Sequence, residues 1–129
     1  MEKVSFDFDG TLDKPSVQNY AKMLVSKGYE VWICTSRVPT ELAFSSRWND
    51  DLFKVADDVG IKRENIKFFQ YEDKYIFLKN KNFMWHLDDD SCELLLINKH
   101  CKPTKGISVF GNTNWIKKCS KLLGIDVSE

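Results

Sequence analysis

The chain has 129 residues, of which 43% are hydrophobic, and this suits one domain (1–129) with a core of its own. Lys plus Arg and Asp plus Glu number 19 each, so no overall charge directs the protein to nucleic acid or to an anionic membrane. No signal peptide precedes the first predicted strand, and apolar runs such as 94–97 are far too short to span a bilayer, so we expect a cytoplasmic protein without a membrane partner.

The first predicted element is a strand that ends in a pair of acidic residues. The stretch 4–11 reads VSFDFDGT, and its alternation predicts that Asp7 and Asp9 share one face of the strand. Gly10 then allows a sharp turn, because it has no Cβ. Two carboxylates beside a hydrophobic run are costly unless a cation or a proton compensates them. The alternative is a solvated Asp-Gly turn on a surface strand.

The next two elements complete a βαβ unit. A helix is predicted from Pro15, with Asp13 as its cap and Gly28 beyond its end. The run 29–34 is apolar and β-branched almost throughout, which is typical of a strand buried on both faces of a parallel sheet, and it closes at Thr35. Strand, helix and strand in such close succession favour parallel pairing.

The rest of the chain continues this alternation. The expected strands are 66–69, 83–87 and 106–110, and the expected helices lie within 39–60, at 73–79, after Asp90 and at 114–123. Asp90 and Glu93 form a capping-box pattern at the start of their helix. The last helix has Thr113 as its predicted cap and Gly124 as its predicted stop. The pattern predicts an α/β fold with one Rossmann-like, doubly wound parallel sheet of about five strands, in the order 3-2-1-4-5.

Polar side chains follow three of these strands, which are neighbours around the switch point of such a sheet. They are Asp7 and Asp9 after the first strand, Thr35 and Ser36 after the second, and Asp88 and Asp89 after the fourth. Four carboxylates in one pocket require a cation, and an all-oxygen ligand set suits Mg²⁺. Hydroxyl and backbone N–H groups of the turns suit phosphate oxygens, so the predicted substrate-binding residues are Phe8, Gly10, Ser36 and Arg37.

These residues resemble a known family. Asp7-Phe8-Asp9-Gly10-Thr11 resembles the DxDGT first motif of the haloacid dehalogenase superfamily of phosphohydrolases. Three further motifs follow in the family's order: Thr35 resembles the second, Lys74 the third, and Asp88-Asp89 with Glu93 the DDxxxE form of the fourth. The resemblance covers 4 to about 97. The intervals after the first and second motifs leave no room for a cap domain, so a capless member is expected.

The resemblance implies a Mg²⁺-dependent phosphatase that hydrolyses a phosphomonoester. Asp7 would attack phosphorus and form an aspartyl-phosphate, while Asp9 would act as general acid and then as general base. Thr35 and Lys74 would hold the phosphoryl oxygens. The implied metal ligands are the Asp7 carboxylate, the backbone carbonyl of Asp9 and the Asp89 carboxylate, with Asp88 acting through water.

Several alternatives stay open at this point. Lys79 and Lys81 lie close to Lys74 in the chain and compete with it for the role of the third motif. A phosphoacceptor receiver domain has a similar size and βα pattern, but it needs an Asp at the end of its third strand, and 66–70 has none. A third alternative is an inactive homologue that binds nucleotide or a partner. The phosphorylated substrate is a small molecule, a nucleotide, a nucleic-acid end or a phosphoprotein, and a second copy of the chain can cover the open pocket.

The four cysteines, Cys34, Cys92, Cys101 and Cys119, are interpreted as buried small hydrophobic residues. A zinc site that combines the last three with His100 is an alternative, although its spacing matches no standard pattern. The other histidine, His86, lies inside the fourth predicted strand and is expected in the core or behind the site.

Overall fold

Five short strands form one parallel sheet in the computed structural model, which describes residues 2–110 and 114–126. The strand order is β3-β2-β1-β4-β5, so the predicted fold class and order are confirmed. Every neighbouring pair is parallel. The strands are β1 (Lys3–Phe6), β2 (Glu30–Thr35), β3 (Ile66–Phe68), β4 (Phe83–Asp88) and β5 (Lys105–Ser108).

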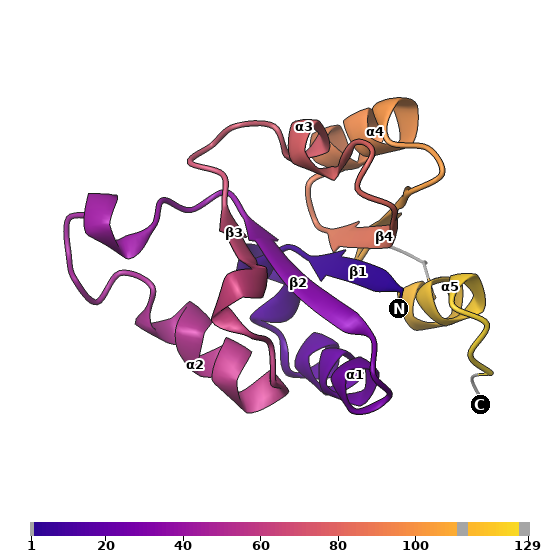
Figure 1. Cartoon of the computed structure of the whole chain (residues 1–129), viewed down its shortest axis with the longest axis horizontal. Helices are drawn as coiled ribbons and strands as arrows, with labels where there is room; N and C mark the ends of the chain where they lie inside the picture. The colour runs from indigo at the N-terminus through magenta and orange to yellow at the C-terminus, as the bar shows by residue number, and fades with distance from the viewer. Residues whose placement is uncertain (1, 111–113, 127–129) are drawn as a thin grey trace.

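Helices cover both faces of this sheet (Figure 1). One layer contains α1 (Pro15–Ser26), α2 (Asp50–Val59) and α5 (Trp115–Leu122), and the other contains α3 (Lys74–Leu78) and α4 (Ser91–His100). Short helical turns at Phe8–Leu12, Thr40–Leu42 and Arg63–Asn65 lie in the connections. No separate cap domain is present among the described residues, in agreement with the prediction.

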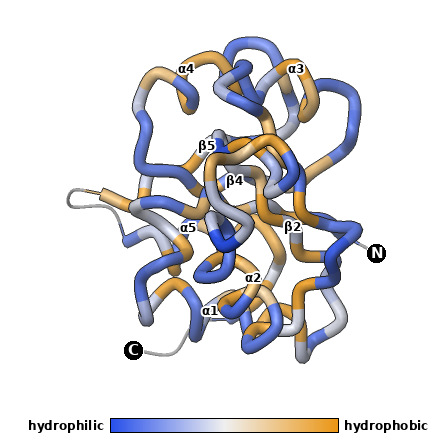
Figure 2. Tube along the Cα trace, turned by 90° about the vertical axis from the view of Figure 1, so that its left-hand side faces the viewer, coloured by the Kyte–Doolittle hydropathy of each residue, from blue (hydrophilic) through white to orange (hydrophobic). Residues whose placement is uncertain are grey.

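The sheet separates two hydrophobic cores. Phe6, Ile33 and Trp85 belong to the cluster beneath α1, α2 and α5, whereas Cys34 and Ile97 belong to the cluster on the α3 and α4 side. Figure 2 shows hydrophobic stretches in the strands between the layers and hydrophilic stretches in many of the outer loops. Each fully buried large apolar side chain contributes about 1.5–3 kcal/mol, so these two cores stabilise the sheet that carries the polar residues at its edge.

The first strand is shorter than predicted. It ends at Phe6, because residues Phe8–Leu12 form a tight helical turn in which the Leu12 N–H donates to the Asp7 carbonyl at 3.1 Å. Side-chain alternation therefore stops before Asp9. The expectation that Asp7 and Asp9 share one strand face was wrong for this reason.

Two of the predicted helix caps also differ. The N-cap position of α1 is Lys14, and the Asp13 carboxylate instead accepts from the Gly10 N–H at 3.1 Å. The N-cap of α5 is Asn114, whose side chain accepts from the Lys117 N–H at 3.4 Å. The predicted cap Thr113 lies outside the described residues.

Three of the cysteines, Cys34, Cys101 and Cys119, are buried as predicted. Cys92 is exposed in the first turn of α4, so that part of the prediction was wrong. Among the described residues, the His, Cys, Asp and Glu side chains close enough together to hold a metal ion are three aspartates, and the residues of the zinc alternative form no such group. Within the same residues, no helix has the length and apolar content needed to cross a membrane.

Candidate active site

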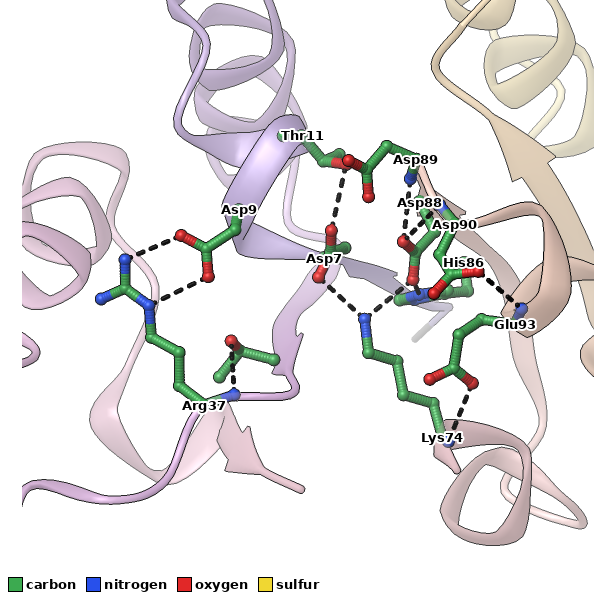
Figure 3. A network of polar contacts seen from close by, with 12 residues as sticks. Asp7, Asp9, Thr11, Arg37, Lys74, His86, Asp88, Asp89, Asp90 and Glu93 are labelled. Atoms are coloured by element: carbon green, nitrogen blue, oxygen red, sulfur yellow. Dashed lines mark hydrogen bonds and ion pairs between the residues drawn. The ribbon is translucent and has the colours of Figure 1, made fainter. Parts of the chain in front are cut away.

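Three aspartates converge at the carboxyl edge of the sheet. Asp7 follows β1, Asp88 ends β4 and Asp89 comes next, and these two strands are neighbours in the sheet. One carboxylate oxygen from each residue lies within 4.8 Å of the other two (Figure 3). The Asp7 N–H donates to the Leu87 carbonyl at 2.9 Å, which extends the pairing of the two strands up to the site. Three oxygens at this spacing suit a hard divalent cation.

Lys74 is buried within this acidic group, although lysine is among the residues least often buried. Its Nζ donates to Asp7 Oδ1 and to Asp88 Oδ2, each at 2.8 Å. The side chain enters from the first residue of α3 and is 2% exposed. Lys79 and Lys81 are exposed, so Lys74 is the lysine of the three that meets the aspartates. The lysine that the resemblance assigns to the third motif therefore lies among the aspartates.

The Asp88 carboxylate is saturated by protein donors. Its Oδ2 accepts from Lys74 and pairs with His86 Nε2 at 2.7 Å, and its Oδ1 accepts from the N–H groups of Asp89 and Asp90 at 2.8 and 3.0 Å. Burial alone would raise the pKa of Asp88, but the hydrogen bond from His86, together with the hydrogen bond and charge of Lys74, holds that pKa well below its ordinary value. Asp88 therefore stays ionised and anchors Lys74.

Behind Asp88 lies a buried histidine that the sequence placed in the core or behind the site. His86 Nδ1 is 2.7 Å from Ser5 Oγ, and these two residues are direct partners in the β1–β4 register. Burial lowers the pKa of His86, so the ring is neutral. Because ionised Asp88 can only accept, Nε2 carries the ring proton and Nδ1 accepts from the Ser5 hydroxyl. This chain of bonds fixes the orientation of Asp88.

Burial raises the pKa of Asp7 to about 8, against the opposing charge of Lys74 and with a further contribution from the charge of Asp88. Asp7 and Asp88 share the one ammonium group of Lys74, which cannot balance two buried carboxylates. Burial also raises the pKa of Asp89. A divalent cation at this position would favour the ionised forms of both residues.

Gly10 allows Asp89 to approach the first loop. Its φ is +81°, and an ideal Cβ on this residue would overlap the Asp89 carboxylate. Gly10 of the first motif and Asp89 of the fourth motif can therefore lie in close contact because residue 10 has no side chain. A residue with a Cβ at position 10 would displace the Asp89 carboxylate.

Asp9 lies apart from the three clustered aspartates. Its carboxylate turns toward Arg37, which donates from Nε to Oδ2 at 3.0 Å and from Nη2 to Oδ1 at 2.8 Å (Figure 3). Asp9 still lines a cavity of about 140 Å³ at the site. The other lining residues are Asp7, Ser36, Lys74, Asp88, Asp89 and Asp90. The predicted four-carboxylate cluster is thus a cluster of three with a fourth carboxylate at its rim.

The predicted phosphate-binding groups on the turns are mostly engaged within the protein. Thr35 is buried, and its Oγ1 accepts from the Arg37 N–H at 3.2 Å. The Gly10 N–H donates to Asp13, and Phe8 is buried with its ring 5.0 Å from the Arg37 guanidinium. Ser36 lines the cavity. Of the four predicted substrate-binding residues, Ser36 has the most direct access to the site.

Three links to the site differ from the sequence prediction or were missed by it. Asp90 caps α4 as predicted, accepting from the N–H groups of Cys92 and Glu93. Glu93 does not complete a capping box: its Oε1 accepts from the Lys74 N–H at 3.2 Å and ties α3 to α4. The Ser5–His86 pair was missed, although two polar residues within apolar strands were a visible signal. Asp51 was also missed, and it contacts the far side of Arg37.

A scan against protein-family models found no match to this chain, and a search of curated proteins found none either. The family resemblance therefore stands on the motifs and on the geometry in which they meet.

Proposed function

We propose that the protein is a Mg²⁺-dependent phosphatase of the haloacid dehalogenase type, which hydrolyses a phosphomonoester through an aspartyl-phosphate on Asp7. The observation that supports this most is the contact of Lys74 with both Asp7 and Asp88 at 2.8 Å. The third-motif lysine thus meets the first and fourth motifs, which lie 67 and 14 residues away in the chain. A solvated acidic surface would not require a buried lysine.

The donor set fits Mg²⁺. Asp7, Asp88 and Asp89 supply only oxygen ligands, which a hard cation prefers. Since Asp88 already accepts from four donors, we assign Asp7 and Asp89 as the direct carboxylate ligands, with the Asp9 carbonyl beside them and Asp88 acting through water. When bound, the cation would offset the negative charge that otherwise repels a phosphate ester from these carboxylates.

The residues then divide the reaction into two displacements. An Asp7 oxygen attacks phosphorus, the bond from phosphorus to the leaving oxygen breaks, and Asp9 gives that oxygen a proton. In the second step Asp9 takes a proton from a water that attacks the phosphorus of the aspartyl-phosphate, which releases phosphate and restores Asp7. Lys74 and the groups around Thr35 and Ser36 hold the phosphoryl oxygens.

The sheet order argues against a receiver domain. Receivers of the flavodoxin-like class have the order 2-1-3-4-5, whereas this chain has β3-β2-β1-β4-β5. No aspartate lies at the end of β3, which continues with Phe69 and Gln70. An inactive binding homologue keeps the same geometry, so activity measurements separate it from the phosphatase.

The first test is hydrolysis of p-nitrophenyl phosphate with Mg²⁺. We expect turnover that EDTA stops and that Asp7→Asn abolishes without loss of the fold. Full activity in Asp7→Asn would remove Asp7 as the nucleophile. A screen of phosphorylated metabolites and oligonucleotides should then identify the substrate class, and sedimentation at assay concentration tests whether a second copy covers the site.

A further inference from the structure

The Asp9 carboxylate is held by two parallel hydrogen bonds from Arg37, as Figure 3 shows. Such a two-pronged contact is the strongest geometry between arginine and a carboxylate. The Asp9 side chain is 59% exposed and that of Arg37 is 14% exposed, so the carboxylate lies at the rim of the cavity and the guanidinium lies beneath it. Both oxygens that could carry a proton to a leaving group are engaged.

The same guanidinium makes a second two-pronged contact. Arg37 Nη1 donates to Asp51 Oδ1 at 2.8 Å, and Nη2 donates to Asp51 Oδ2 at 3.0 Å. Nη1 also lies 3.4 Å from the Trp48 carbonyl and from Asn49 Oδ1. These hydrogen bonds, those from Asp51 above all, raise the pKa of Arg37, and the Arg37 contact lowers the pKa of Asp51. Asp51 thus fixes Arg37 from the side that faces away from the site.

This arrangement has a consequence for proton transfer if the proposed function holds. Asp9 can reach a leaving group only when its carboxyl group turns away from Arg37. A partly buried arginine without a partner would resist that turn, because an unpaired buried charge is costly. With Asp51 in place, Arg37 keeps one complete carboxylate partner while Asp9 turns.

We propose that Arg37 and Asp51 are positioning residues for Asp9. Arg37 holds the Asp9 carboxyl group at the rim of the cavity, and Asp51 retains Arg37 when Asp9 turns toward the leaving oxygen. Neither residue is assigned a contact with the reacting atoms. The inference rests on the proposed function, because it concerns the proton that Asp9 delivers.

The test compares two leaving groups within each variant. p-Nitrophenolate departs without a proton, whereas the alkoxide of propyl phosphate needs one. Without the Asp51 carboxylate, Arg37 has Asp9 as its remaining carboxylate partner and holds it more tightly. In Asp51→Asn we therefore expect the ratio of kcat/KM for p-nitrophenyl phosphate to kcat/KM for propyl phosphate to rise about fivefold or more, because kcat/KM covers the steps up to departure of the leaving group and not the later hydrolysis of the aspartyl-phosphate. Since both rates come from one preparation, partial loss of folded protein cancels in the ratio.

Asp50→Asn is the matched control. Asp50 is the neighbouring acid on the same helix, and it pairs with exposed Arg47 at 2.9 Å. Asp50→Asn removes the same charge as Asp51→Asn but only from an exposed ion pair. The ratio of the kcat/KM values for the two esters should therefore stay within about twofold of the wild-type ratio. An equal rise in both variants would overturn the inference, because it would reflect the helix terminus and not Arg37.

The double variant separates action through Arg37 from any other role of Asp51. In an Arg37→Met background, Asp51→Asn should leave the ratio unchanged, since the group on which it acts is gone. A full effect of Asp51→Asn in that background, or no effect in the wild-type background, would overturn the inference alone. If the wild type hydrolyses neither ester with Mg²⁺, the proposed function fails and this inference fails with it.

Discussion

Gly10 and Asp89 share one small space at the edge of the sheet, where the carboxylate fills the volume that a Cβ on residue 10 would need. Because φ at Gly10 is +81°, the backbone itself also favours glycine. The turn at Phe8–Leu12 and the residues that follow β4 therefore pack directly against each other.

Replacing this glycine should disturb metal binding more than stability. In Gly10→Ala we expect the Asp89 carboxylate to be displaced and Mg²⁺ affinity to fall by about tenfold or more, as is typical when metal ligands lose their support. Gly28→Ala is the control, since Gly28 has φ of +94° but nothing within 4 Å of an added Cβ. Calorimetric Mg²⁺ titration of both variants checks this. Equal Mg²⁺ affinity in the two variants would contradict the assigned role of Asp89.

Removal of the buried lysine should cost both stability and activity. Lys74→Met leaves Asp7 and Asp88 without their shared cation, and breaking a buried ion pair in this way costs about 3–5 kcal/mol. Denaturant unfolding measures this loss, and kcat with p-nitrophenyl phosphate should fall by about a hundredfold or more. The exposed Lys79 provides the control, and Lys79→Met should change neither quantity appreciably. If Lys74→Met were as active as Lys79→Met, Lys74 would not be the functional lysine of the third motif.

The sheet and the meeting of Asp7 with Asp88 and Asp89 could be predicted from the sequence. Apolar strands alternating with helices favour one parallel order, and the carboxyl ends of parallel strands meet at a single edge. The position of Lys74 at the start of a helix before β4 followed from the family resemblance. Its burial between two aspartates was visible only in the structure.

The orientation of Asp9 could not be predicted. Strand alternation carries information only as far as the strand lasts, and β1 ends at Phe6. The Asp9–Arg37–Asp51 chain depends on where α2 begins relative to the end of β2, and no local pattern encodes that distance. Cys92 was misplaced because its position on the outer face of α4 depends on the packing of the helix and not on its residue type.

The pH dependence of stability should reveal the raised pKa of the Asp7 carboxyl group. With divalent ions chelated, its pKa is about 8 in the folded protein and about 4 in the unfolded chain. The unfolded state loses this proton first, so the contribution of Asp7 to the free energy of unfolding falls as pH rises from about 4 to 8, by up to about 1.4 kcal/mol per unit, and is constant above that.

Asp7→Asn isolates this contribution. The wild type minus Asp7→Asn difference cancels His86, whose lowered pKa changes stability in the opposite direction as pH rises. Urea unfolding in EDTA at several pH values should show the wild type minus Asp7→Asn difference in the free energy of unfolding becoming more negative toward pH 8, and Mg²⁺ should weaken this pH dependence. A difference that does not vary with pH would mean that Asp7 is ionised throughout the range.

The buried pair behind the site should contribute to folding. In Ser5→Ala the His86 Nδ1 loses its partner in a fully buried position, and an unsatisfied polar atom of this kind costs about 1–3 kcal/mol. Ser26 is exposed and bonds locally to the Met23 carbonyl, so Ser26→Ala should change the free energy of unfolding by only about 0.5 kcal/mol or less. Chemical denaturation compares the two variants, and equal costs would mean that the Ser5 contact contributes little.

The most direct test of the proposed mechanism is to identify which residue receives the phosphoryl group during turnover. Asp9→Asn should still accept phosphate from p-nitrophenyl phosphate but should release it slowly, since the base for the attacking water is missing. Quenching with borohydride reduces an aspartyl-phosphate to homoserine, which peptide mass spectrometry locates. We predict homoserine at position 7 in the presence of Mg²⁺ and none with EDTA. An unmodified Asp7 in a protein that turns over the substrate, or homoserine at another aspartate, would contradict the account.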